Sequence, residues 1–247
     1  MFKIGDTNFN THGTLMKIIQ YNKYNDIIVE FQDEYKYRTN TCCQNFKKGK
    51  IKNPYDKTIR NVGFIGVGKY KKTTNGRRNN CYDIWYDMLD RCYSDKMYYT
   101  YDDKIVCDEW HCLQNFGEWY DNNYYEILGQ DMDLDKDILV KGNKIYSPET
   151  CVFVPHDINI LVNNNKKKRG QYPIGVSYHN IANKYQTRCS FYGTEVHLGL
   201  FDTEYEAFQK YKIEKEKYIK EVANKYKEQI PQKLYDALLK YEIDEND

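Results

Sequence analysis

The sequence predicts an α+β protein made of several small modules, and three patterns along its 247 residues lead to that class. Residues 1–66 contain short β-rich runs separated by turn-forming residues, which predict a small N-terminal β-barrel. Residues 81–163 combine amphipathic helices with a β-hairpin, and residues 173–229 carry three strand patterns followed by one long helical pattern. The basic segments 67–80 and 164–172 are expected to link these modules, and residues 230–247 are expected to end the chain in a helix.

Composition narrows the class of protein before any motif is considered. The formal net charge is only +1, so overall charge does not indicate a nucleic-acid partner and local basic segments must carry that argument. No stretch approaches the roughly 20 apolar residues of a membrane helix, and the first residues lack the apolar segment of a signal peptide. Eight cysteines without such a signal indicate reduced thiols, so we expect a cytoplasmic protein without a membrane partner.

The N-terminal β-rich runs are expected at 14–20, 26–31 and 35–39. In the second run Ile27, Val29 and Phe31 alternate with other residues and give that strand one apolar side. The small-residue and turn pattern resembles a Src-homology-type barrel, through Gly5-Asp6, Gly13 and the segment Phe46-Lys-Lys-Gly49. Barrels of this kind bind peptides, nucleic acid or nothing, so the resemblance assigns no site.

Two basic segments stand out against the nearly neutral overall charge. Residues 69–78 contain five basic residues and no acidic one, and their Asn and Gly indicate an exposed segment. Residues 166–169 are three lysines and an arginine. Each segment is either a solvated linker or an arm on DNA phosphates, where each contact would add about 0.9 to the salt dependence of log K. The candidate contact residues are Lys71, Lys72, Arg77, Arg78, Lys166, Lys167, Lys168 and Arg169.

The middle stretch predicts two longer helices, a hairpin and a short helix. The first helix begins residues 81–98, and its apolar face consists of Ile84, Trp85, Met88, Leu89 and Cys92. The second helix is expected over 113–125. Beyond it we expect a hairpin of 134–139 with 144–146, a strand at 152–154, and a short helix with Pro155 in its first turn.

The C-terminal strands are expected at 175–179, 184–191 and 195–201, with Asn183 and Gly193 at the turns between them. Thr203 and Glu206 have the spacing of a capping box, which predicts the start of the long helix. Pro231 predicts the start of a last helix over 232–243.

An ordered set of motifs runs through residues 173–223: Gly175-Val176, Lys184-Tyr185-Gln186, Gly193, Leu198-Gly199-Leu200-Phe201, Thr203, Glu206, Ala207 and Tyr211. This set resembles the plant ethylene-response-factor (Apetala-type) DNA-binding domain. In that family the face of the sheet lies in the major groove, so the resemblance implies double-stranded DNA as a partner. It places five outward residues in the groove: Ser177, His179, Lys184, Gln186 and Arg188.

The chemistry of these five residues suits base recognition, because a ribbon of strands fits the major groove and arginine to guanine is the commonest specific contact. The plant domain carries several arginines on these strands, whereas this chain has one Arg, one Lys and one Gln there. An outward polar face without a ligand is the alternative interpretation.

The segment LDKDILVKGNKIYSPETCVFVPHDIN contains Asp135, a central Asn143, and then His156 and Asn159. Upstream lie Trp85-x-x-Met-Leu-x-Arg-Cys-Tyr93 and the aromatic residues Trp110, Phe116 and Trp119. Together these residues resemble the HNH endonuclease core of phage homing-type proteins, a β-hairpin followed by a helix around a divalent metal. The resemblance implies a phage-encoded protein in the host cytoplasm that uses Mg²⁺ or Mn²⁺ if it is active. Asp135 with His156 or Asn159 would hold the metal, and Asn143 would fix the loop.

One residue departs from the HNH pattern. Lys136 stands where those nucleases keep the histidine that activates water. Hydrolysis assisted by one metal needs a base with a pKa near neutrality, whereas a lysine side chain ordinarily has a pKa of about 10.4 and is protonated. Burial could lower such a pKa, or Asp137 could act as the base. A finger kept for DNA contact or packing after the loss of catalysis is the interpretation that the missing base favours.

Two classes of function follow from these patterns. The first is a DNA-binding HNH-type endonuclease with Asp135, Asp137 and Asn143 as catalytic residues. The second is a catalytically inactive phage accessory, anti-defence or regulatory protein that binds DNA or a host protein. Zinc is not the predicted metal: Cys107, His111 and Cys112 are clustered, but the sequence contains no Cys-x-x-Cys pair.

Overall fold

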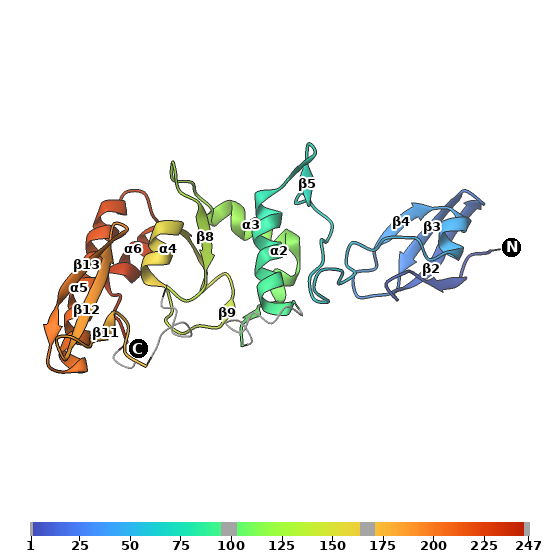
Figure 1. Cartoon of the computed structure of the whole chain (residues 1–247). Helices are drawn as coiled ribbons and strands as arrows, with labels where there is room; N and C mark the ends of the chain where they lie inside the picture. The colour runs from blue at the N-terminus through green and yellow to red at the C-terminus, as the bar shows by residue number, and fades with distance from the viewer. Residues whose placement is uncertain (1, 95–102, 164–170, 245–247) are drawn as a thin grey trace. The chain divides into compact units, whose positions relative to one another are not determined.

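The computed structural model describes residues 2–94, 103–163 and 171–244, and the chain divides into two compact units, residues 1–122 and 123–247 (Figure 1). It is a mixed α/β protein with several separate sheets. The finer domain boundaries expected from the sequence stay predictions. No helix in the described ranges is long and apolar enough to cross a lipid bilayer.

An antiparallel four-stranded sheet forms the N-terminal part of the first unit. Its strands follow chain order: β1 (Thr7–Phe9), β2 (Leu15–Lys23), β3 (Asp26–Phe31) and β4 (Arg38–Thr41), with α1 (Cys43–Lys47) after them. The expected alternation in β3 is confirmed, because Ile27, Val29 and Phe31 are fully buried. The expected closed barrel is wrong for the described residues, where the short edge strands β1 and β4 do not pair with each other. Phe46 of α1 joins the core of this open sheet and helps to cover its apolar face.

The stretch at 67–80, expected as a linker, contains a β-hairpin of β5 (Thr73–Thr74) and β6 (Arg77–Arg78). Its turn residues Asn75 and Gly76 have φ angles of 52° and 76°. Positive φ at both central residues is the signature of a type I′ turn, which matches the twist of paired strands. The Asn-Gly dipeptide was therefore a hairpin signal, whereas the sequence analysis took it only as a sign of an exposed segment.

Two helices and a tryptophan cluster form the rest of the first unit. Helix α2 (Asn80–Tyr93) begins where the side chain of Asn79 accepts a hydrogen bond from the backbone of Cys81. Trp85 of α2 donates its indole N–H to the carbonyl oxygen of Trp110 at 2.7 Å. The other elements of this part are β7 (Ile105–Val106), the 3-10 turn η1 (Asp108–His111) and α3 (Leu113–Asn123).

The second unit begins with a finger formed by β8 (Met132–Asp135), β10 (Val152–Pro155) and α4 (His156–Val162). The expected hairpin of 134–139 with 144–146 is wrong, because β8 pairs with β10 and ends at Asp135. The carboxylate of Asp135 accepts hydrogen bonds from the backbone N–H groups of Asp137 and Ile138, which turns the chain out of the strand. The segment 145–146 is a separate two-residue strand, β9 (Ile145–Tyr146).

The three C-terminal strands are confirmed as an antiparallel sheet in the order β11 (Val176–His179), β12 (Lys184–Phe191), β13 (Thr194–Phe201). Helix α5 (Glu204–Tyr226) begins with the expected capping box of Thr203 and Glu206. The last helix, α6 (Gln232–Leu239), ends four residues earlier than expected.

Helix α5 packs against both the sheet and the finger. Its N-terminal half buries Phe208 and Tyr211 with Cys189 of β12. Its C-terminal half belongs to a second core with residues of the finger and α6, and the buried members of this core include Val152, Val154, Ile158, Tyr218, Ile219, Val222, Ala223, Leu234 and Leu238. The finger and the C-terminal sheet are therefore two surfaces built on one helix.

We expect Gly175→Ala to destabilise the second unit by about 2–4 kcal/mol, through left-handed strain plus overpacking. Gly175 has a φ of +75°, and an added Cβ would lie 2.1 Å from the Tyr211 ring. The matched control is Gly193→Ala, which shares the strain at φ +79° but meets no atom within 4 Å, so we expect about 1 kcal/mol. Urea unfolding measures both, and equal losses would show that the Tyr211 contact is not tight.

Candidate nucleic-acid interface

The five residues predicted to read DNA lie on strands β11 and β12. Side chains alternate between the two faces of a strand, and Thr187 and Cys189 of β12 are buried on the side of α5. Gln186 and Arg188 therefore occupy the opposite face. Ser177 pairs with Gln186 across the strands, and the Gln186 amide donates to the Ser177 hydroxyl at 3.1 Å.

Acidic partners accompany both cations of this face. Arg188 forms an ion pair with Glu195 of β13 at 2.8 Å, and Lys184 forms one with Asp202 at 2.9 Å. His179 is occupied in the turn after β11, where its Nδ1 accepts a hydrogen bond from the backbone of Ala182 at 3.1 Å. Because both ion pairs are largely exposed, each contributes about 0–1 kcal/mol and can exchange for another partner.

The loop that follows β8 is held by the side chain of Asn143. Its amide donates to the carbonyl oxygens of Lys136 and Ile145, both at 2.7 Å. At the start of the same loop, the carboxylate of Asp135 accepts from the N–H groups of Asp137 and Ile138 at 2.9 and 2.7 Å. Burial, and then the neighbouring carboxylate of Asp137, raise the pKa of Asp135 to about 6.

Lys136 lies inside this loop and is only 6% exposed. Its ammonium group donates to the carboxylate of Asp137 at 2.9 Å and lies 5.6 Å from the centre of the Tyr146 ring. An ammonium held by a carboxylate and an aromatic face is a hydrogen-bond donor at this position. Lys136, which the HNH resemblance sets at the position of the water-activating histidine, is thus buried and paired.

The carboxylate that contacts His156 is that of Asp133. Asp133 Oδ2 lies 2.7 Å from His156 Nδ1 and accepts a hydrogen bond from the Asn159 amide at 2.8 Å. The hydrogen bond to Asp133 raises the pKa of His156, and the charge of Asp133 adds to this shift. Sequence reasoning missed Asp133, although a second carboxylate two residues before Asp135 on one strand was the available signal.

Across the described ranges, no group of three or more His, Cys, Asp and Glu side chains is placed to hold a metal ion. Near Cys107 and Cys112, His111 instead contacts Tyr93 and Asp108, with 3.5 Å from Nε2 to the Tyr93 hydroxyl and 3.6 Å from Nδ1 to Asp108. Desolvation lowers the pKa of His111.

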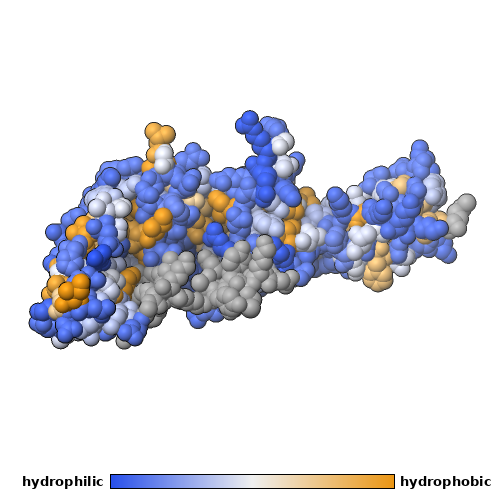
Figure 2. Space-filling model, in the orientation of Figure 1, coloured by the Kyte–Doolittle hydropathy of each residue, from blue (hydrophilic) through white to orange (hydrophobic). Residues whose placement is uncertain are grey.

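The basic hairpin carries the other described candidates for DNA contact. Lys71, Lys72, Arg77 and Arg78 are all exposed, and Figure 2 shows the hairpin as a hydrophilic projection. Arg78 forms an ion pair with Asp83 at 2.6 Å. The second basic segment, with Lys166, Lys167, Lys168 and Arg169, lies outside the described residues.

Comparison of the chain with models of protein families, with curated proteins and with solved structures found no match.

We expect Asp135→Asn to change how stability depends on pH in metal-free buffer. The pKa of Asp135 is about 6 in the folded chain and about 3.9 in the unfolded chain. Its contribution to the stability of the folded state is therefore fully present below about pH 4. That contribution is lost as the pH rises through 6, at a cost on the order of 2 kcal/mol. The asparagine oxygen still accepts both N–H groups but cannot ionise. Urea unfolding at pH 4.5 and 7.5 should therefore show that the free energy of unfolding of the variant rises relative to that of the wild type at the higher pH. Equal differences at both pH values would contradict the raised pKa of Asp135.

Proposed function

We propose that this chain is a phage-type DNA-binding protein of HNH homing-endonuclease ancestry that acts in the host cytoplasm. The observation that carries the proposal is the shared outward face of Ser177, Gln186 and Arg188 on a sheet whose other face is covered by α5. Arginine pairs with guanine and glutamine with adenine in the major groove, which a small antiparallel sheet can enter.

The finger supports the nuclease-type ancestry. Its order of strand, loop, strand and helix is that of a ββα element. Asn143 bridges the two ends of the loop through Lys136 and Ile145, which is the role that the HNH resemblance implies for the central asparagine.

We propose further that the protein binds DNA without cutting it. A general base must accept the proton of the attacking water, whereas Lys136 is buried and its ammonium donates to Asp137. The same ion pair engages Asp137, the other candidate base. The finger then contributes DNA contact and packing, as expected of a frame that has lost catalysis.

A second candidate function, metal-dependent DNA cleavage, is favoured by the contact between Asp133, His156 and Asn159. A carboxylate, an imidazole and an amide oxygen are ligand types that suit Mg²⁺ or Mn²⁺. Asp133 and His156 would hold such a cation with Asn159 beside them, and the cation would stabilise charge on the scissile phosphate. In this case Asp135 would keep the loop in shape through its backbone contacts.

We expect the protein to retard double-stranded DNA in a gel, with an affinity that falls as salt rises. Arg188→Ala should weaken binding to a preferred sequence about 5- to 150-fold, because one good base contact is worth about 1–3 kcal/mol. The control is Lys217→Ala, an exposed cation of α5 that pairs with Glu221 and lies off the sheet face. Equal losses in both variants would contradict the role of the face, and no retardation at all would direct the search to a host protein.

We expect supercoiled DNA to remain intact with Mg²⁺ or Mn²⁺, because the loop offers no free base. Incubation of a plasmid with the protein and either metal, followed by gel analysis of nicked circles, measures this outcome. Metal-dependent nicking that disappears in Asp133→Ala or Asp135→Ala would contradict the non-cleaving form and establish the second candidate function.

A further inference from the structure

The basic hairpin of the first unit offers a second ribbon, separate from the C-terminal sheet. Strands β5 and β6 pair in the register Thr73 with Arg78 and Thr74 with Arg77. Neighbouring side chains on a strand point to opposite faces, so Arg77 and Arg78 lie on different faces of the ribbon. The tip consists of Asn75 and Gly76, and nothing lies within 4 Å of the position that a Cβ on Gly76 would take.

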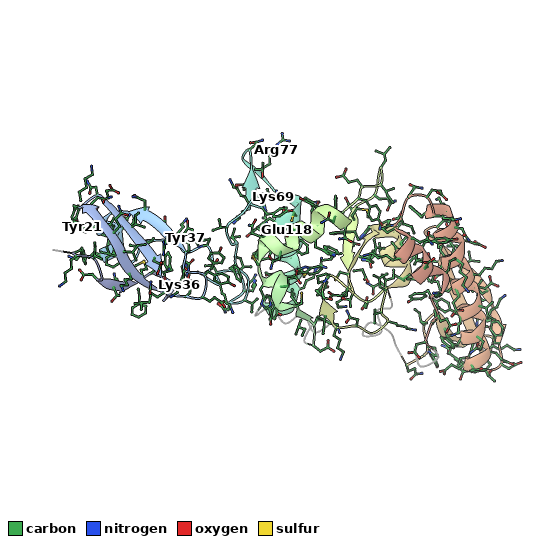
Figure 3. All side chains as sticks on the ribbon, turned by 180° about the vertical axis from the view of Figure 1, so that it is seen from behind. Tyr21, Lys36, Tyr37, Lys69, Arg77 and Glu118 are labelled. Atoms are coloured by element: carbon green, nitrogen blue, oxygen red, sulfur yellow. The ribbon has the colours of Figure 1, made fainter. Side chains whose placement is uncertain are left out.

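The basic side chains of this hairpin differ in whether they contact the rest of the first unit. Arg78 donates to Asp83 at 2.6 Å, Lys69 pairs with Asp121 at 2.7 Å, and the ammonium of Lys72 lies 5.7 Å from the Tyr82 ring. These three contacts attach the base of the hairpin to α2 and α3. Arg77 makes no hydrogen bond, ion pair or ring contact with any described residue, and Figure 3 shows it at the far end of the hairpin from Lys69.

The dimensions of the hairpin fit one groove of DNA. From Lys72 to the turn, three residues at about 3.3 Å each give a reach of roughly 10 Å, comparable with the major-groove depth of about 8.5 Å. Two strands about 4.8 Å apart, with their side chains, suit a groove about 12 Å wide and are too broad for the minor groove of about 6 Å. A tip of Asn and Gly adds little bulk, so the residue after the turn can approach the base edges.

Resting on the proposed DNA-binding function, we propose that the β5–β6 hairpin enters the major groove and that Arg77 reads a guanine there. The guanidinium of Arg77 donates to O6 and N7 of the base, the pairing that identifies guanine in this groove. Arg78 is a positioning residue that holds the ribbon against Asp83, and Lys71 and Lys72 neutralise phosphates beside it. The chain then recognises DNA with a ribbon in each of its two units.

The test uses the full-length protein and a binding site selected from randomised duplex DNA. The Kd is measured by fluorescence anisotropy for the selected duplex and for duplexes with each guanine replaced in turn. For the wild type, one replacement should weaken binding about 5- to 150-fold. For Arg77→Ala the same replacement should have no effect, and other replacements should keep theirs. Arg38→Ala is the matched control, because this exposed arginine of β4 pairs with Glu30 and should leave all the preferences unchanged.

Each other outcome overturns the inference in a recognisable way. If Arg77→Ala weakens all duplexes equally and lowers the salt slope by about 1, Arg77 contacts a phosphate rather than a base. If Arg77→Ala keeps every preference of the wild type, the hairpin does not read DNA, while the proposed DNA binding stands. If the wild type binds no duplex, both the inference and the proposed function fail.

Discussion

Burial of helix α5 is the constraint on which the second unit depends. Phe208 and Tyr211 in its first half pack under the C-terminal sheet, whereas Ile219 and Val222 in its second half pack against the finger. Burying an aromatic or aliphatic side chain of this size contributes about 1.5–3 kcal/mol. Separating either half of α5 from its partner would therefore cost several such contributions. Because a helix is stiff over 23 residues, the sheet face and the finger loop keep a fixed spacing and orientation. Two surfaces that approach one duplex from a common frame lose less freedom on binding than two tethered domains.

Sequence periodicity could predict the elements whose apolar pattern decides their structure. The alternation in β3, the three C-terminal strands and the capping box of Thr203 with Glu206 follow from local rules, and the structure confirms them. Pairing between distant segments was not predictable in the same way. Strand β8 ends at Asp135, whose side chain binds two backbone amides, and it pairs with the distant β10 rather than with the next segment of the chain. No residue pattern predicts these contacts. The N-terminal sheet stays open because the short helix α1 covers its apolar face, a role that the sequence analysis had given to further strands.

The candidate site was likewise predictable in its residue types but not in its contacts. The type of residue at each position, such as the amide of Asn143 or the carboxylate of Asp135, is visible in the sequence, but its contacts depend on loop conformation. Asp133 and His156 are 23 residues apart and meet only because β8 and β10 are paired beneath the start of α4. Likewise, the HNH resemblance sets Lys136 at the position of a histidine, but only the structure shows Lys136 buried against Asp137 and Tyr146. This contact, which no residue pattern predicts, is the observation behind the proposal that the protein does not cut DNA.

A net charge of +1 is compatible with specific DNA binding when acidic residues stand among the reading residues. If the chain binds DNA as proposed, Glu195 and Asp202, which pair with Arg188 and Lys184, would weaken the attraction of the sheet face for phosphates and keep non-specific affinity low. At the correct sequence the exposed ion pairs cost little to exchange, and a carboxylate released from Arg188 can itself accept a hydrogen bond from the amino group of cytosine. At a wrong sequence the same carboxylates face phosphates or other acceptors and repel them. Under the proposed function, the acidic neighbours would therefore reduce affinity for every duplex, but least for the correct one, and this difference would give the protein its specificity.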